Sequence, residues 1–328
     1  MQKHVFSLRQ AIGFVILVGL LLRLLVFAYI AFEPRKFYTY DSDGYDRRAI
    51  NLLQYGMLAG EAQPPLTPDL SRTPVYPLFL AAVFGVFGHV PAAAVLLQIV
   101  FGSLTGALVV LLVRELELPQ WAGVLAGLIV AIDPVSLMTA NRLLTETLFT
   151  TLLVASVLTL VYFWRRGQVR WLVLSATLFA LMALTRPISQ VLPIALLPLF
   201  VGAARRWKLQ RALMYGVLFV VISTALTYSW AYRNYQQAGV FTLSTISDTN
   251  LIYYRARAVL AAAQHSSQDE AWQQLQDRIT AQATAQHLTP DETLQLQRKE
   301  AIGIFVSHPL LTAKMFLSGV GRIFVDPG

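Results

Sequence analysis

Residues 11–32 read AIGFVILVGLLLRLLVFAYIAF, an apolar run broken by a single charge, Arg23. A helix of this length spans a bilayer at 1.5 Å per residue, and the run is longer than a signal-peptide core. Lys3, His4 and Arg9 precede it, and no small-residue cleavage pattern ends it. We therefore expect a retained first membrane helix. The sequence leaves open whether Arg23 pairs inside the bundle or contacts a ligand.

The composition extends this expectation to the whole chain. Of its 328 residues 56% are hydrophobic and 13% are charged, with a mean hydropathy of +0.56, whereas about 25% of residues are charged in soluble domains. Backbone amides in lipid must be paired within their own segment, so long apolar runs indicate helices. Cysteine is absent, which excludes disulfide and thiolate chemistry. The predicted fold class is an all-α, polytopic membrane bundle.

The charges between the apolar runs predict the topology. Short cytoplasmic loops collect Lys and Arg. If the run at 74–88 stays on the outer side as a shallow or re-entrant helix, seven spans precede residue 233. The other runs lie at 92–113, 121–132, 143–164, 171–185, 188–203 and 212–232. The inner set of basic residues is then Lys3, Arg9, Arg114, Arg165, Arg166, Arg170, Arg205, Arg206, Lys208 and Arg211.

Beyond residue 233 the composition becomes polar and rich in Gln and Ala. The patterns SQDE at 267–270 and TPDE at 289–292 are typical of capping boxes at helix starts. They indicate short helices on the outer surface. The expected parts are a bundle over 1–232 with a large outer loop at 33–74, an outer helical segment over 233–300, and a membrane-returning helix over 301–328.

The outer loop contains an unusual polar and aromatic stretch. Residues 37–48 read FYTYDSDGYDRR, with three carboxylates, two guanidiniums and four aromatic rings. Carboxylates accept hydrogen bonds from sugar hydroxyls and rings stack on sugar C–H faces, although an aromatic belt at the lipid headgroups is the alternative. In an extended or turn segment Asp41 and Asp43 would point the same way. They could then hold a divalent cation, or divide the roles of base and orienting group.

Two more charges adjoin apolar runs. Glu146 begins the run at 143–164, and an ionisable group at membrane depth is a functional candidate, although it also favours its own helix N-terminus. Arg186 lies before Pro187, where its guanidinium could grip a lipid phosphate or snorkel to ordinary phospholipid. The five histidines show no metal-ligand spacing. The net charge of +8 belongs largely to the inner loops, so we expect no nucleic-acid partner.

Five motifs in a fixed order carry a resemblance. They are DSDGY at 41–45, RTPVYPLFL at 72–80, LLTETLF at 143–149, LTRP at 184–187, and YRNY at 232–235 with Gly239. This order resembles the bacterial membrane glycosyltransferases of the type C (GT-C) superfamily, in particular the protein-mannosyltransferase-like and aminoarabinose-transferase-like group of glycosyltransferase family 39. The resemblance covers most of residues 8 to 250.

The resemblance implies an inverting transfer of a sugar from a polyprenyl-phosphate donor to a lipid, glycan or protein acceptor at the outer face of the bacterial inner membrane. An acid of the first outer loop is essential in that family, and its spacing to Tyr45 matches Asp41, with Asp43 as a helper. Glu146 would hold sugar hydroxyls, and arginines would stabilise the leaving phosphate. The expected substrate-binding residues are Tyr45, Arg72, Tyr76, Arg186, Arg233 and Asn234.

One departure from the family pattern concerns the C-terminus. Members of the family continue with several more helices, whereas this sequence stops at Gly328, so we expect a truncated form or an incomplete groove. Two readings from other classes stay open: a flippase or transporter, which would show repeated halves with broken helices, and a binder of polyprenyl-phosphate sugars without turnover. The cofactor is unknown, with a divalent cation as one possibility.

Overall fold

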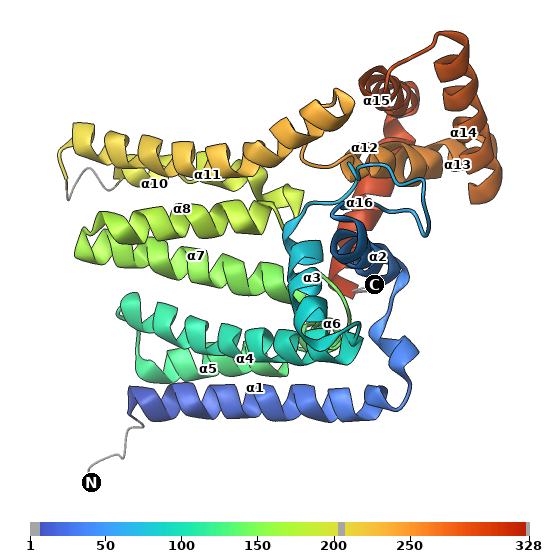
Figure 1. The fold of residues 1–328 in the computed structure, drawn as a ribbon. Coiled ribbons are helices and arrows are strands. Elements are labelled where there is room, and N and C mark those ends of the chain that lie inside the picture. Colours follow the sequence, from blue (N-terminus) through green and yellow to red (C-terminus); the bar gives the residue numbers. More distant parts are fainter. Residues whose placement is uncertain (1–6, 203–206, 326–328) are drawn as a thin grey trace. The chain divides into compact units, whose positions relative to one another are not determined.

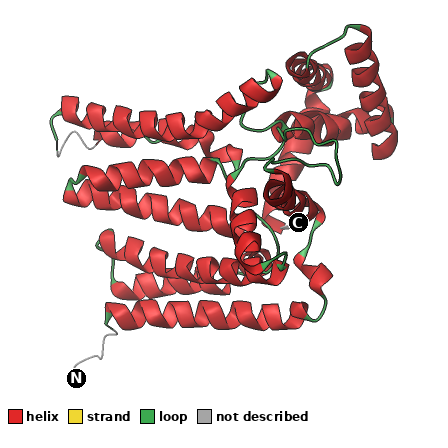
Figure 2. Cartoon of the chain, in the orientation of Figure 1, coloured by secondary structure: helices red, strands yellow, loops and turns green. Residues whose placement is uncertain are grey.

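The computed structural model describes residues 7–202 and 207–325, and every regular element in these ranges is a helix (Figure 2). The all-α fold class is thereby confirmed. Three members of the predicted inner basic set, Lys3, Arg205 and Arg206, lie outside the described residues, as do His4 and the last three residues of the range 301–328. The chain divides into two compact units.

The first unit comprises residues 1–69 and 73–230. Figure 1 shows its long helices lying side by side, with α1 against both α4 and α5, α4 against α7, and α7 against α8, while α3 runs across the end at which α7 begins. The bounds of these helices are α1 Leu8–Ala31, α3 Val75–Phe87, α4 Pro91–Glu115, α5 Gln120–Ile132, α7 Glu146–Arg166 and α8 Val169–Ala183. Shorter elements connect them: η1 Pro34–Phe37, α2 Tyr40–Tyr55, α6 Pro134–Ala140, η2 Pro187–Val191, α9 Leu192–Ala195 and α10 Leu197–Gly202.

Several of these helices have the length and composition of membrane spans. Within the described residues four do so unbroken, namely α1, α4, α7 and α11 (Leu209–Ala238). The count becomes six if two bent pairs, α5 with α6 and α15 with α16, each form one span. Helix α3 has 13 residues, fewer than the roughly 20 that a straight span needs. Helix α8 and residues 187–202 are also apolar but short, so the predicted seven spans remain a prediction.

Glycines bring α4 and α5 close together. A Cβ atom on Gly106 would lie 3.1 Å from the carbonyl oxygen of Gly127, and one on Gly127 would lie 2.9 Å from the carbonyl oxygen of Gly106. Small residues at such positions let helix backbones approach in lipid, where packing rather than the hydrophobic effect drives association. This contact fixes α5 against the centre of the unit.

The predicted outer loop at 33–74 contains a helix, which corrects the expectation of an extended or turn segment around Asp41 and Asp43. Helix α2 begins after Thr39, whose amide donates to Ser42 Oγ at 2.8 Å, and it ends at Gly56 with a φ of 69°. Acids in a first turn are stabilised by the helix dipole. At 3.6 residues per turn, positions two apart face in nearly opposite directions, so Asp41 and Asp43 do not share a face.

The second unit comprises residues 70–72 and 231–328. It contains the end of α11, α12 (Ile246–Asn250), a π-helical turn (Leu251–Ala256), α13 (Arg257–Gln264), α14 (Gln268–Ala285), α15 (Pro290–Ser307) and α16 (Pro309–Val325). Both predicted capping boxes are confirmed, at the starts of α14 and α15. The expected division at residue 300 falls inside α15, and the chain bends instead at His308.

Candidate active site

Glu146 and Arg186 form an ion pair in the first unit. Glu146 is the first residue of α7, and Arg186 directly precedes η2. Arg186 Nη1 lies 2.5 Å from Glu146 Oε1 and donates to Thr145 Oγ1 at 3.3 Å. The two side chains are 40% and 38% exposed, so a ligand can reach both. The structure thus brings together two residues of the predicted site that are 40 positions apart in the sequence.

The backbone around Arg186 is anchored by the segment that carries the motif RTPVYP. Helix α8 ends at Ala183 because the proline at 187 disfavours a helical conformation in the residue before it. Thr73 Oγ1 donates to the carbonyl oxygen of Thr185 at 3.0 Å, and the amide of Val75 donates to that of Leu184 at 3.1 Å. Two of the five motifs therefore meet in space.

A buried chain of hydrogen bonds joins α3 to the turn before α7. Tyr76 is fully buried, and its hydroxyl donates to Gln98 Oε1 at 2.6 Å. Gln98 Nε2 in turn donates to the carbonyl oxygen of Arg142 at 2.6 Å. The ring of Tyr45 packs edge-on against Tyr76, with centroids 5.0 Å apart. Buried polar groups whose hydrogen bonds are made in this way rigidify their surroundings. These hydrogen bonds therefore fix the turn that precedes Glu146.

Helix α2 places the two predicted acids differently. Ser42, Tyr45 and Ala49 are buried and define the inward stripe of the helix. Asp41 and Asp43 are both exposed, but Asp41 lies one turn before Tyr45 and so shares its side of the helix. Asp43 lies one turn before the exposed Arg47, on the outward side. Among residues 7–202 and 207–325, no group of three or more His, Asp or Glu side chains could hold a metal ion.

Sequence reasoning counted Asp46 among the three carboxylates of residues 37–48 but did not single it out as a site residue. Asp46 is 8% exposed, and its two carboxylate oxygens lie 2.9 and 3.0 Å from Nε2 of His89. It also hydrogen-bonds Tyr38; burial first, and then the negative charge of Asp46, raise the pKa of the Tyr38 phenol well above its usual value. A helical reading of 37–48 would have placed Asp46 beside Ser42 and Tyr45 on the inward stripe.

Arg23 is hydrogen-bonded within the bundle, one of the two alternatives that the sequence left open. It is 1% exposed, and its Nη1 and Nη2 atoms donate to the carbonyl oxygens of Ala131 and Val130 at 3.3 and 3.4 Å. A cation at the last turn of α5 is stabilised by the helix dipole. Its Nε has no hydrogen-bond partner among the described residues.

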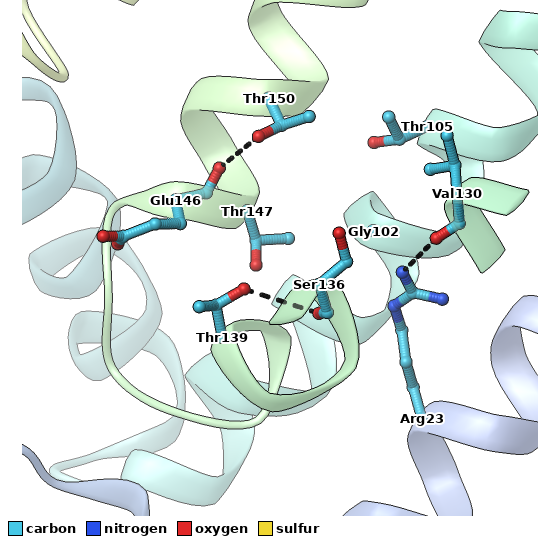
Figure 3. A pocket seen from close by; sticks show the side chains of 9 residues that line it. All are labelled: Arg23, Gly102, Thr105, Val130, Ser136, Thr139, Glu146, Thr147 and Thr150. Carbon is cyan, nitrogen blue, oxygen red and sulfur yellow. Dashed lines mark hydrogen bonds between the residues drawn. The ribbon is translucent and has the colours of Figure 1, made fainter. Parts of the chain in front are cut away.

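A small cavity separates Arg23 from Glu146 (Figure 3). Its volume of about 20 Å³ holds about one water molecule. Figure 3 shows the Glu146 carboxylate pointing away from Arg23, on the far side of Thr147, so the two charges do not pair. The side chains of Thr105, Ser136, Thr139, Thr147 and Thr150 complete the lining.

The remaining predicted residues belong to the second unit. Asn234 is fully buried; its Nδ2 donates to the carbonyl oxygen of Thr242 at 2.7 Å, and its Oδ1 accepts from Arg233 Nη1 at 3.0 Å. Asn234 therefore ties the chain reversal at Gly239, which has a φ of 72°, back onto α11. Arg72 ends the short stretch 70–72 of this unit, where the amide of Thr245 donates to the carbonyl oxygen of Leu70 at 2.9 Å.

Comparison with known families places these contacts in context. Residues 71–230, just under half of the chain, match the family model described as dolichyl-phosphate-mannose-protein mannosyltransferase. This match supports a GT-C-like membrane glycosyltransferase. The resemblance predicted from the motifs is confirmed, and the span candidates support an integral, multi-pass membrane protein. The matched region includes Tyr76, Glu146 and Arg186 but not α2. Among curated proteins, none matches the chain significantly.

Proposed function

We propose that this glycosyltransferase moves a sugar from a polyprenyl-phosphate donor to an acceptor hydroxyl on the outer face of the bacterial inner membrane. The observation that carries the proposal is the accessible Glu146–Arg186 pair. It lies in the region that matches a family described by a lipid-phosphate sugar. Arg186 donates to Thr145, and the carbonyl oxygen of Thr185, the residue before Arg186, accepts from Thr73 in the neighbouring motif segment.

Arg186 is the proposed contact for the donor phosphate. Its hydrogen bond to Thr145 and its ion pair with Glu146 both use Nη1. A guanidinium has five N–H donors in a fixed fork, so the Nε and Nη2 edge can still bind a phosphate. Such a contact stabilises the negative charge that grows on the leaving polyprenyl phosphate. Glu146 then accepts hydrogen bonds from the hydroxyls of the transferred sugar.

Asp41 is the proposed general base. Its carboxylate takes the proton of the acceptor hydroxyl while that oxygen attacks the anomeric carbon, and the carbon–oxygen bond to the phosphate breaks with its electron pair on the phosphate. One displacement of this kind inverts the anomeric configuration. The position of Asp41 on the side of α2 that carries Tyr45 supports this role, whereas Asp43 lies on the outward side.

Three of the expected substrate-binding residues belong to the second unit. Arg72 and Arg233 remain candidates for substrate binding, as the sequence predicts. Asn234 is fully buried and already bonded on both its amide oxygen and its nitrogen. We therefore assign Asn234 a positioning role in place of the direct substrate contact expected from the sequence.

The test measures free polyprenyl phosphate released from a radiolabelled polyprenyl-phosphate sugar by the full chain in liposomes with cell-envelope acceptors. General base catalysis contributes ~10²–10⁴ in rate, so Asp41→Asn should lose at least a hundredfold. Asp43→Asn is the matched control in the same helical turn and should change the rate by no more than about twofold. Full activity of Asp41→Asn would refute the base assignment. Donor binding without release by the unmodified protein would favour a binder or flippase.

A further inference from the structure

The second unit contains a cleft that the proposed chemistry does not use. It lies between the chain that follows α11 and the first turns of α15, and its volume is about 150 Å³. This is the size of a single sugar ring rather than of an oligosaccharide. The lining residues that matter here are Phe241, Asp248, Asp291, Gln295 and Arg298.

Charged and amide groups in the cleft hold one another in place. Arg298 donates to Asp248 Oδ1 from Nε at 3.1 Å and from Nη2 at 2.9 Å. Asp248 is 7% exposed, and because both bonds end on Oδ1, the guanidinium does not occupy Oδ2. Gln295 Nε2 donates to Asp291 Oδ2 at 2.7 Å. Side chains already fixed by such bonds lose little entropy when a ligand binds.

The charge balance of the cleft selects against anions. Two carboxylates face one guanidinium, so the net charge of the lining is negative. A phosphate would be repelled, which makes this cleft unsuitable for the head of a polyprenyl-phosphate donor. A neutral ligand that both donates and accepts hydrogen bonds would suit the carboxylate, amide and guanidinium groups together.

Phe241 supplies the apolar part of the site. Its side chain is 57% exposed although the neighbouring Val240 is 2% exposed, so the loop buries one residue and presents the other at the cleft. The bond from Asn234 to the carbonyl oxygen of Thr242 fixes the loop beside the ring. A rigid aromatic face next to paired polar groups matches the apolar C–H face and the hydroxyl edge of a sugar.

We propose that this cleft binds one neutral sugar ring of the acceptor, which makes the acceptor a glycan or glycolipid. The assignment of the sugar to the acceptor rests on the proposed glycosyl transfer, because the donor sugar carries a phosphate that the cleft repels. Phe241 stacks on the ring, while Asp248, Asp291 and Gln295 bond its hydroxyls. In this arrangement Asn234 acts on acceptor binding through the loop that it holds.

The experiment is saturation-transfer NMR on the full chain in detergent micelles, without donor, using methyl glycosides of glucose, galactose, mannose and N-acetylglucosamine as probes. At least one glycoside should receive saturation from the protein. Phe241→Ala and Gln295→Ala should each weaken its binding about tenfold, the equivalent of about 1.4 kcal/mol. Because Gln295 is exposed on a helix, its variant keeps the proposal testable if Phe241→Ala fails to fold.

Two controls match these variants. Tyr254 is 55% exposed and lines a different cleft of the same unit, and Gln274 is exposed on α14; Tyr254→Ala and Gln274→Ala should leave binding unchanged. No saturation of any glycoside, or equal weakening by the controls, overturns the proposal. Displacement of the sugars by tetramethylammonium at equal concentration would instead identify a cation site and also overturn it. Failure of the proposed function has a separate readout, the absence of polyprenyl phosphate release.

Discussion

The two ends of α7 each carry exposed arginine–glutamate pairs, yet they differ in what surrounds them. At the first residue, Glu146 pairs with Arg186, whose side chain is 40% exposed. At the last residues, Arg166 lies 3.2 Å from Glu115 and is 41% exposed, and Arg165 pairs with Glu117. The arginines at the two ends are therefore about equally exposed and each is paired with a glutamate, so an ion pair alone does not identify a site.

The surroundings separate the two ends. Near Glu146 the contacts are buried and polar, because Tyr76 and Gln98 form a hydrogen-bonded chain and a small cavity adjoins the first turn. Near Arg166 they are aromatic: its guanidinium lies 4.0 Å from the ring centre of Tyr162, and Phe163 packs against Trp207. Polar groups held in fixed positions next to space can bind and orient a ligand, whereas aromatic packing stabilises the helix end.

Exchanging one glutamate for glutamine at each end of α7 gives the largest expected difference between the two ends, measured as the rate of polyprenyl phosphate release. Glu146→Gln removes a charged acceptor for sugar hydroxyls and the partner of Arg186, and hydrogen bonds to charged groups contribute about 1.5–3 kcal/mol. We expect the rate of polyprenyl phosphate release to fall about ten- to a hundredfold. Glu115→Gln removes the shared partner of Arg165 and Arg166 at the end of α7 that has no proposed role in transfer, and it should leave the rate nearly unchanged. Equal losses would show that the two ends do not differ in function.

Removing one tyrosine hydroxyl near each end of α7 compares how much the two hydroxyls contribute to the stability of the protein. Tyr76→Phe leaves Gln98 Oε1 buried without its donor, and an unsatisfied buried group costs about 1–3 kcal/mol. We expect a lower melting temperature in detergent. Tyr162→Phe keeps the ring that packs against Trp171 and Arg166, so the change in the free energy of unfolding should stay within about 0.5 kcal/mol. If the Tyr76→Phe protein were as stable as the unmodified protein, the buried hydrogen bonds from Tyr76 through Gln98 would not fix the turn before α7.

How much of the fold and of the candidate site could be predicted from the sequence depends on how far apart the interacting residues lie along the chain. The apolar runs and both capping boxes depend on neighbours within a few residues, and they predicted the helices and the starts of α14 and α15. The stretch 37–48 was misjudged because its three aspartates and Gly44 are weak helix formers, while the cap that starts α2 depends on Thr39 and Ser42. Propensity is a weak prior that such a cap and the packing of Tyr45 override.

Long-range contacts to backbone atoms had no signal in the sequence. Arg23 donates to carbonyl oxygens more than 100 positions away, and every residue has such an oxygen, so no residue type marks the partner. Asp46 and His89 are 43 positions apart, with a single histidine and no spacing pattern. By contrast, Glu146 and Arg186 were predictable as candidates because each is a charge beside an apolar run, although their direct pairing was not.

Replacing one arginine by lysine at each end of α7 tests the proposed phosphate contact. Arg186→Lys keeps the positive charge but loses the planar fork that binds a phosphate with two parallel bonds. We expect kcat/KM for the donor to fall about tenfold, or about 1.4 kcal/mol. Arg166→Lys at the other end should change it by no more than about twofold. If Arg186→Lys retains full kcat/KM, its guanidinium does not bind the phosphate in a bidentate manner.

The smallest expected effect is a pH dependence confined to the Arg166 end. Hydrogen bonding to Arg165, and then its charge, lower the pKa of Glu117 from the ordinary value of 4.5. A lowered pKa in the folded state gives stability that is present above 4.5 and disappears as pH falls through the lowered value. Glu117→Gln should therefore melt slightly below the unmodified protein at neutral pH, and the difference should vanish in acid. Because Glu117 pairs with Arg165 at the end of α7 opposite to Glu146, the pH profile of polyprenyl phosphate release should be identical in the two proteins. A shifted profile would mean that the end carrying Arg165 also takes part in transfer, and the distinction between the two ends would fail.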